Sequence, residues 1–206
     1  MNRLNIYSRD ILVALLLVLL IGCSSPKLAP LGADATILAF GDSLTYGVGT
    51  TESNSYPSVL AALSGLSVVN SGVSGETSDL GLKRFPKELD RVAPDLVILI
   101  EGGNDILQNR NHAETKANIK GMIDIAKNRG IPIVLVGVPN KNLFSDSAPF
   151  YKELADQYHL VFDSALIGDL LRSPSLKSDT VHLNKNGYRK MADSIYKLLR
   201  ENGALI

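Results

Sequence analysis

A serine, a histidine and an aspartate in this sequence have the types and spacing that acyl transfer requires. Ser43 stands where an apolar run ends, in GDSLTYG (41–47), and His182 follows Asp179 by three residues in DTVH (179–182). A serine hydroxyl becomes a nucleophile when a histidine removes its proton, and a carboxylate holds that histidine in one tautomer. We therefore predict Ser43 as the nucleophile, His182 as the base and Asp179 as the group that orients His182.

Acyl transfer also needs hydrogen-bond donors for the negatively charged oxygen of the tetrahedral intermediate. Asn104, in EGGND (101–105), offers a side-chain amide. Gly72, in NSGVSGETS (70–78), has no side chain to block the approach of a substrate to its backbone N–H. The backbone N–H of Ser43 is the third candidate, so we predict an oxyanion hole made by Ser43, Gly72 and Asn104.

Two other interpretations of these residues remain open. Ser43 on its own would be read as a turn residue, because serine and glycine are common in turns. Ser74 is a rival nucleophile. The stretch 72–76, GVSGE, differs from the Gly-x-Ser-x-Gly nucleophile elbow of α/β-hydrolases only in its last residue, which is Glu76. We interpret two neighbouring acidic residues as structural. Asp42 is expected to hold its loop together through hydrogen bonds, and Asp105 to act as a helix cap or, preferably, as a brace that holds its loop in place.

The elements that must position these residues alternate along the chain. Continuous Val/Ile/Leu runs are typical of strands buried on both faces of a parallel sheet, and they occur at 36–40, 67–70, 95–100, 131–138 and 159–162. Helical patterns lie at 54–63, 79–92, 114–129, 148–157 and 186–200, the second with Pro86 expected to break or kink it. Repeated β-α-β units predict a three-layer α/β/α sandwich with a five-stranded parallel sheet.

Three of the polar blocks stand after the first three predicted strands, and the fourth, with Asp179 and His182, precedes the last predicted helix. Ligands bind at the carboxyl ends of strands in such sheets. Together GDSLTYG, Gly72, GGND and DTVH resemble the signature blocks of the SGNH (GDSL) hydrolases, named for Ser, Gly, Asn and His. The stretches SGETSDLGLKRFP and ILIEGGNDIL further resemble the bacterial arylesterase, acyl-CoA thioesterase and lysophospholipase I group. The resemblance covers roughly residues 36–202. One departure is Leu183, where the family often has proline.

The resemblance implies a flavodoxin-like fold and a serine esterase without a cofactor. Its acyl-enzyme would form on Ser43, with aryl esters, acyl thioesters or lysophospholipids as substrates. A carbohydrate O-deacetylase on the same fold is an alternative, and a non-catalytic flavodoxin-like ligand-binding lipoprotein is another. We expect the segments 105–114 and 139–150 to set substrate specificity, since binding residues concentrate in such connections.

The start of the chain forms a separate segment. The apolar run 11–21 would make about 17 Å of helix against about 30 Å of hydrocarbon, which suits a signal peptide better than a membrane span. LIGC (20–23) resembles the lipobox of bacterial lipoproteins, which implies lipidation of Cys23. We expect a signal peptide at 1–22, a lipidated cysteine and flexible tether at 23–35 and the hydrolase domain at 36–206. An uncleaved membrane anchor is the competing interpretation.

The expected location is the bacterial cell envelope, with the protein held in a membrane through lipidated Cys23. Ser24, which follows the cysteine, is not the aspartate associated with inner-membrane retention in enteric bacteria. We therefore expect an outer-membrane protein that faces the periplasm.

Composition excludes several other classes. Lys plus Arg equals Asp plus Glu at 21 each, so there is no basic excess to favour nucleic-acid binding. Cys23 is the only cysteine, which rules out an intrachain disulfide and a cysteine-based metal site. No His, Asp and Glu group has metal-ligand spacing, so we predict no metal. The sequence leaves the oligomeric state open.

Overall fold

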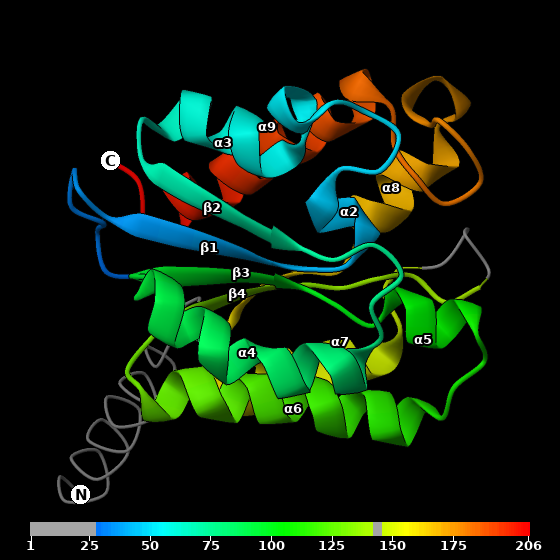
Figure 1. The fold of residues 1–206 in the computed structure, drawn as a ribbon, viewed down its shortest axis with the longest axis horizontal. Helices are drawn as coiled ribbons and strands as arrows, with labels where there is room; N and C mark the ends of the chain where they lie inside the picture. Colours follow the sequence, from blue (N-terminus) through cyan, green and yellow to red (C-terminus); the bar gives the residue numbers. More distant parts are fainter. Residues whose placement is uncertain (1–27, 142–145) are drawn as a thin grey trace, which may run out of the picture.

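The computed structural model describes residues 28–141 and 146–206, which form a parallel sheet between two layers of helices (Figure 1). The strand order is β2-β1-β3-β4-β5, and every pair is parallel. The strands are β1 (Thr36–Gly41), β2 (Ser67–Gly72), β3 (Leu96–Ile100), β4 (Ile133–Val136) and β5 (Val161–Asp163). This confirms the predicted five-stranded α/β/α sandwich.

Burial explains why the apolar runs became strands. Every residue of the central strands β3 and β4 is buried, as expected for strands covered on both faces. The edge strand β2 is mostly half-buried and carries polar residues, including Asn70. The core therefore lies along β1, β3 and β4, and the edge strand β2 can carry polar side chains because it is less buried.

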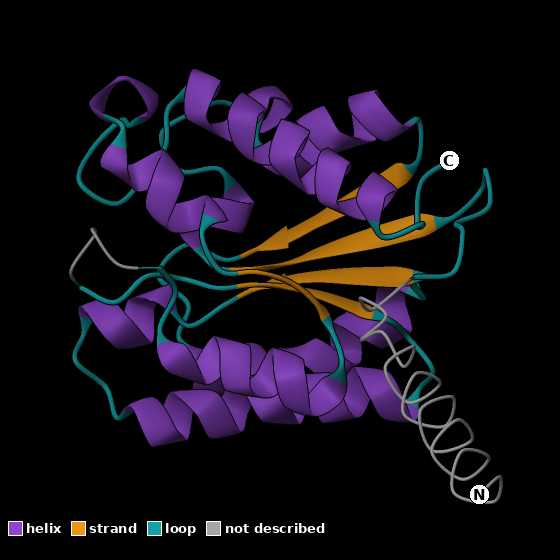
Figure 2. Ribbon diagram, turned by 180° about the vertical axis from the view of Figure 1, so that it is seen from behind, coloured by secondary structure: helices purple, strands orange, loops and turns teal. Residues whose placement is uncertain are grey.

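The helices divide between the two faces of the sheet (Figure 2). One layer contains α2 (Ser43–Tyr46), α3 (Tyr56–Ser64), α8 (Leu166–Arg172) and α9 (Lys185–Glu201). The other contains α4 (Ser78–Val92), α5 (Gly103–Leu107), α6 (His112–Asn128) and α7 (Pro149–Tyr158). Short 3₁₀ turns lie at Glu52–Asn54 and Pro174–Leu176. The predicted N-cap of α9 is confirmed, because the Asn184 side chain accepts from two N–H groups of its first turn.

Helix α4 runs without a break through Pro86, where the sequence predicted either a break or a kink. A proline inside a helix removes one hydrogen bond and costs about 3 kcal/mol. Phe85 and Leu89 on the same helix are buried against the sheet, and their burial offsets that cost. Tertiary packing therefore holds the helix together where local propensity argues against it.

The strand order places a topological switch point between β1 and β3. The chain moves from β1 outward to β2, then returns across β1 to β3, so the loops after β1 and β3 turn to opposite sides. Ligands bind in the crevice that such a divergence opens. Ser43 follows β1 and Asn104 follows β3, and both therefore flank the crevice.

The segment 28–35 lies against the domain, although the sequence predicted a tether as far as residue 35. The Leu28 N–H donates to the Asn202 carbonyl at 2.8 Å, and the Leu31 N–H donates to the Ala204 carbonyl at 2.9 Å. Both leucines pack on the core, so apolar burial and backbone pairing hold the segment against the C-terminal end of the chain. The predicted signal peptide and Cys23 lie outside the described residues. Within the described part of the chain, no helix is both long and apolar enough to span a membrane.

Candidate active site

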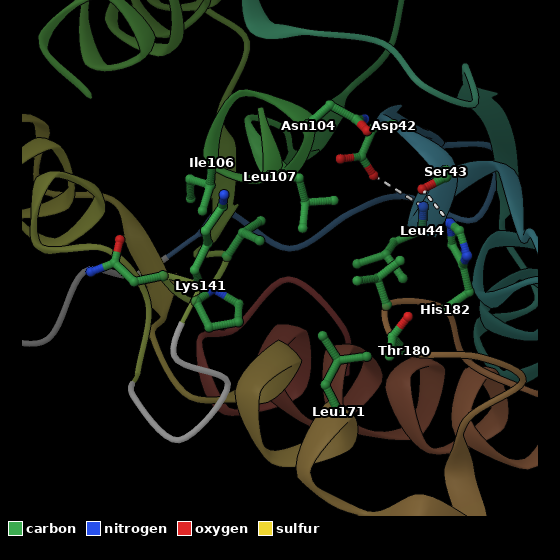
Figure 3. A pocket seen from close by; sticks show the side chains of 15 residues that line it. Asp42, Ser43, Leu44, Asn104, Ile106, Leu107, Lys141, Leu171, Thr180 and His182 are labelled. Carbon is green, nitrogen blue, oxygen red and sulfur yellow. Dashed lines mark hydrogen bonds between the residues drawn. The ribbon is translucent and has the colours of Figure 1, made fainter. Parts of the chain in front are cut away.

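Ser43, His182 and Asp179 form one chain of hydrogen bonds at the carboxyl edge of the sheet, and Figure 3 shows the bond between Ser43 and His182. Ser43 Oγ lies 3.0 Å from His182 Nε2. His182 Nδ1 lies 2.7 Å from Asp179 Oδ2. The structure thus brings together the three residues that the sequence predicted, although Ser43 and His182 lie far apart in sequence.

Ser43 owes its place to the short helix α2. The Asp42 carboxylate accepts the Leu44 N–H at 3.0 Å and so caps the helix directly after β1. Ser43 is the first helical residue, where no preceding turn supplies an acceptor for its N–H. The hydroxyl of Ser43 meets His182, and its N–H has no acceptor within the described residues.

The turn that carries the histidine explains the three-residue spacing of DTVH. Asp179 Oδ1 accepts the backbone N–H groups of Val181 and His182, both at 2.8 Å, while Oδ2 meets the imidazole. One carboxylate thus shapes the turn and orients the ring. Partial burial raises the pKa of Asp179, but the hydrogen bonds from the His182 ring and the two N–H groups outweigh it and lower the pKa overall. Asp179 is therefore ionised at neutral pH and can hold His182 with Nε2 facing Ser43.

Leu183, which stands where the family often has proline, anchors this loop by packing. It is buried and pairs in an antiparallel bridge with Lys177. The Ser178 N–H also donates to the His182 carbonyl at 3.0 Å. The departure from the family pattern therefore leaves His182 fixed and removes no reacting group.

Asn104 lies in the first turn of α5 and lines the same cavity as Ser43 and His182. Its Nδ2 donates to the Glu76 carbonyl at 2.8 Å, which fixes the orientation of the side chain. An amide carries two N–H donors, so the second is left for a ligand. This placement agrees with the predicted oxyanion role of Asn104.

Gly72 does not supply the open donor that the sequence predicted. Its N–H already donates to Asn70 Oδ1 at 2.9 Å. A Cβ on Gly72 would lie 2.0 Å from the Tyr46 backbone nitrogen, so glycine is needed there for close packing of β2 against α2. The predicted oxyanion role of Gly72 is therefore wrong.

Gly75 is the better candidate in the same loop. It has a φ of 80°, and no described residue accepts its N–H. It directly precedes Glu76, whose carbonyl holds Asn104. The rival nucleophile Ser74 is exposed in this loop, and the histidine bond in the described structure goes to Ser43 instead. The second glycine of GVSGE was the signal that sequence reasoning missed.

Four buried carboxyl groups lie beneath the site: Asp42, Glu76, Glu101 and Asp105. Burial raises the pKa of Asp42 to about 6, with further contributions from the nearby Glu76 and Asp105, against the Leu44 hydrogen bond and the charge of His182. Sequence reasoning assigned Asp42 a structural role and did not identify Glu76 or Glu101. These four carboxyl groups follow three different strands, so their clustering can be seen only in the folded structure.

Two of these carboxylates connect elements around the site. Asp105 accepts the Ser78 N–H at 2.8 Å and hydroxyl at 2.7 Å, which ties α5 to α4 and confirms the predicted brace. Arg84 pairs with Glu76 through Nε at 2.9 Å and Nη2 at 2.6 Å. The helix α4 therefore holds both the loop that contacts Asn104 and the helix that carries it.

A cavity of about 380 Å³ opens beside Ser43 and Asn104 (Figure 3). Its apolar lining residues are Leu44, Ile106, Leu107, Val138, Pro139, Leu171 and Val181. The segment expected to set specificity at 105–114 supplies two of these residues, from a helix rather than a loop, and the described part of 139–150 supplies Pro139, Asn140 and Lys141. No three His, Cys, Asp or Glu side chains in the described segments are grouped to hold a metal.

Comparisons with known proteins agree with this geometry. The model of the GDSL-like Lipase/Acylhydrolase family matches residues 39–190. The arylesterase of Vibrio mimicus is 29% identical over 181 residues, which cover 82% of this chain and 88% of that protein. The thioesterase 1/protease 1/lysophospholipase L1 of Escherichia coli (strain K12) is 27% identical over 173 residues, with coverages of 80% and 83%.

A solved structure gives the same result. AlinE4, an SGNH-hydrolase family esterase, is 30% identical, with a TM-score of 0.64 over 83% of this chain and 97% of its own. The family match spans most of the domain and includes Ser43, Asn104 and His182. The chain therefore belongs to the GDSL-like lipase/acylhydrolase family and is an esterase or acylhydrolase.

Proposed function

We propose that this protein is a serine esterase that hydrolyses acyl esters or thioesters through an acyl-enzyme on Ser43. The observation that carries the proposal is the hydrogen-bonded series from Ser43 through His182 to Asp179. This arrangement supplies a nucleophile, a base and an orienting carboxylate in one place.

The reaction proceeds in two halves. His182 Nε2 takes the Ser43 proton as Oγ attacks the carbonyl carbon, and the protonated imidazole then gives that proton to the leaving oxygen or sulfur. Water next attacks the acyl-enzyme, with His182 again accepting a proton and returning it to Ser43 Oγ. Asp179 stabilises the imidazolium in both halves without taking the proton.

The oxyanion is bound by the Ser43 N–H and by the free N–H of the Asn104 amide. We assign the third donor to Gly75, because its N–H faces no protein acceptor in the described structure and its loop contacts Asn104. Removal of one oxyanion donor usually lowers kcat by about 10²–10³.

The cavity favours an acyl chain as the substrate group. Its volume lies in the range of small-ligand sites, and apolar side chains form most of its wall. A sugar acetate would leave this apolar surface unused. The relatives named arylesterase and thioesterase/lysophospholipase support aryl esters, acyl thioesters or lysophospholipids as the class.

We also propose that Cys23 is lipidated and holds the enzyme in the outer membrane, facing the periplasm. Support comes from the sequence alone: an apolar run of signal-peptide length that ends in LIGC. Metabolic labelling with a radioactive fatty acid tests this proposal, because Cys23→Ala should abolish incorporation.

Turnover of p-nitrophenyl acetate and p-nitrophenyl octanoate tests the proposed activity. The full chain in mild detergent is compared with Ser43→Ala and with Ser74→Ala as a matched control. We expect Ser43→Ala to abolish turnover, Ser74→Ala to retain it, and octanoate to be preferred over acetate in kcat/KM. Turnover that survives in Ser43→Ala would exclude the mechanism, and a strong acetate preference would favour the deacetylase.

A further inference from the structure

Glu101 is a fully buried carboxyl group that the mechanism above does not use. It follows β3 directly and precedes Gly102, Gly103 and Asn104, so it stands at the base of the turn that presents an oxyanion donor. Its side chain has no exposed surface. Oε1 accepts the Gly102 N–H at 3.3 Å, and Oε2 has no hydrogen-bond partner in the described structure.

The charges that face Glu101 are mostly negative. Asp42 at the end of β1, Glu76 after β2 and Asp105 in α5 are all buried nearby. From α4, Arg84 is already paired with Glu76, and Gly81 lies against the Glu101 side chain. From α7, the Tyr151 hydroxyl donates to the Glu101 carbonyl at 2.7 Å.

These surroundings favour the uncharged acid. Burial raises the pKa of Glu101 well above its usual value, and the charges of Asp42, Glu76 and Asp105 raise it further, against the weak Gly102 hydrogen bond. An ionised Oε2 would be a buried charge without a donor or a cation, which is strongly unfavourable.

The turn after Glu101 is held from both sides by this residue and by Tyr151. Gly102 has a φ of 101°, and a Cβ there would lie 2.8 Å from the Tyr151 hydroxyl. The backbone of Glu101 is bound by Tyr151, and its side chain binds the next N–H. Two residues later the chain reaches Asn104, so any movement of this turn changes the position of the Asn104 amide.

We propose that Glu101 is a positioning residue for Asn104 that supports the oxyanion hole only as the uncharged acid. Loss of its proton leaves a negative charge on Oε2, which must be hydrated by water entering between β3 and α4. The turn at Gly102 then opens, and Asn104 loses its place beside Ser43. The proposal rests on the esterase function and adds an alkaline limit to its activity.

The test compares the pH profiles of wild-type enzyme, Glu101→Gln and the exposed control Glu153→Gln, with p-nitrophenyl butyrate as substrate. Glutamine keeps the shape and can never ionise. We expect kcat of the wild type and of Glu153→Gln to fall reversibly at alkaline pH, by about tenfold one pH unit above the midpoint, with KM little changed. Glu101→Gln should stay within about threefold of its own neutral kcat over the same range.

Near-UV circular dichroism at each pH ensures that only folded enzyme is compared. An alkaline fall shared by all three proteins, or a fall in none of them, would overturn the proposal. A change in KM alone would also overturn it. If Glu101→Gln does not fold, Glu101→Met provides a second uncharged side chain, to be judged by the same profile. Failure of the esterase function is recognised separately, because turnover would then survive in Ser43→Ala.

Discussion

At the scale of single residues, the Asp42 carboxylate supports catalysis but destabilises the folded state. Its carboxylate caps α2 and so fixes Ser43, and it lies close enough to His182 for the two charges to interact. The ionised form stabilises an imidazolium during catalysis. The same charge is costly for folding because the group is buried.

The cost of this charge should appear in the pH dependence of stability. The pKa of Asp42 is raised from 3.8 to about 6, so the folded state binds more protons than the unfolded state between these values. The free energy of unfolding therefore falls as the pH rises through this window, by on the order of 2–3 kcal/mol from this group. In Asp42→Asn, which keeps the acceptor for the Leu44 N–H, that part of the fall should be missing.

Urea unfolding at pH 4 and pH 7 checks this prediction. The stability of Asp42→Asn relative to wild type should increase from pH 4 to pH 7, while its kcat at pH 7 decreases. A stability difference that is the same at both pH values would show that Asp42 does not titrate in this window.

Asp179 allows a second prediction, on activity. Replacement of a buried triad aspartate by asparagine lowers kcat by about 10⁴, because the histidine takes the wrong tautomer. The Asp179 side chain is 50% exposed, so water can replace part of its effect. We expect Asp179→Asn to lower kcat by about 10²–10³ with a smaller change in KM, measured with p-nitrophenyl octanoate. Asp193→Asn, an exposed ion-pair partner on α9, should leave kcat unchanged.

At the scale of elements, α4 organises the oxyanion side of the pocket. Arg84 on this helix pairs with Glu76, donates to Ser71 at the end of β2 and stacks over the Phe40 ring at 4.0 Å. Glu76 in turn holds Asn104 through its carbonyl. The Arg84 side chain thus links α4 to β1, to β2 and to the loop that contains Glu76.

Arg84→Met should therefore lower both stability and activity. It leaves Glu76, whose side chain is 5% exposed, as a buried charge without its cation. We expect a loss of about 2–4 kcal/mol in the free energy of unfolding and a fall of about tenfold in kcat. Arg91→Met removes the more exposed pair with Glu88 and should cost at most about 1 kcal/mol, with no effect on kcat. Equal effects of the two substitutions on kcat would contradict the role of Arg84.

The sequence predicted the elements whose signal is local. Continuous apolar runs located all five strands, and Asn184 located the start of α9, since burial and capping leave their mark within a few residues. The continuity of α4 through Pro86 was not predictable in the same way, because the burial that holds the helix comes from residues far away in sequence. The very short helices α2 and α5 carry no periodic signal.

The sequence predicted the reacting groups of the site but not the residues that hold them in place. Ser43, Asn104 and His182 stand in recognisable blocks. Gly72 was predicted as an oxyanion donor, and the bond from its N–H to Asn70, which occupies that donor, cannot be seen in a sequence. The pairing of Glu76 with Arg84 likewise depends on how a loop folds back on a helix.

At the scale of the whole molecule, the N-terminal segment and the pocket lie at opposite ends of the sheet. Leu28 lines a hollow with Ile133 and Val161, the first residues of β4 and β5. Ser43 stands two residues beyond Gly41, the last residue of β1, about 20 Å away along the strand direction. Figure 1 shows the C-terminus, four residues after the Asn202 carbonyl that accepts the Leu28 N–H, across the molecule from α2 and α5.

This separation has a consequence if Cys23 carries a lipid. The five residue steps from Cys23 to Leu28 span at most about 18 Å, too short to turn the pocket onto the anchoring membrane while Leu28 stays bound. Lipidated enzyme in vesicles should therefore hydrolyse soluble p-nitrophenyl octanoate as fast as it does in detergent. A non-exchanging long-chain ester in the same bilayer should be hydrolysed at least tenfold more slowly. A twenty-residue Gly/Ser insertion after Ser24 should relieve that difference.

Equal rates on the bilayer ester with and without the insertion would show that the pocket already reaches the anchoring membrane. The soluble ester provides the control in each preparation, because its rate reports the amount of active enzyme. The outcome decides whether the substrates come from the anchoring membrane or from the aqueous side.

Covalent labelling shows which serine carries the acyl group, and we expect it to be Ser43. A fluorophosphonate ester is incubated with the full chain, and the labelled peptide is identified by mass spectrometry. We predict one label, on Ser43, formed much more slowly in His182→Ala and absent in Ser43→Ala. A label on Ser74, or turnover of esters by a protein that takes no label, would contradict the assignment of Ser43 as the nucleophile.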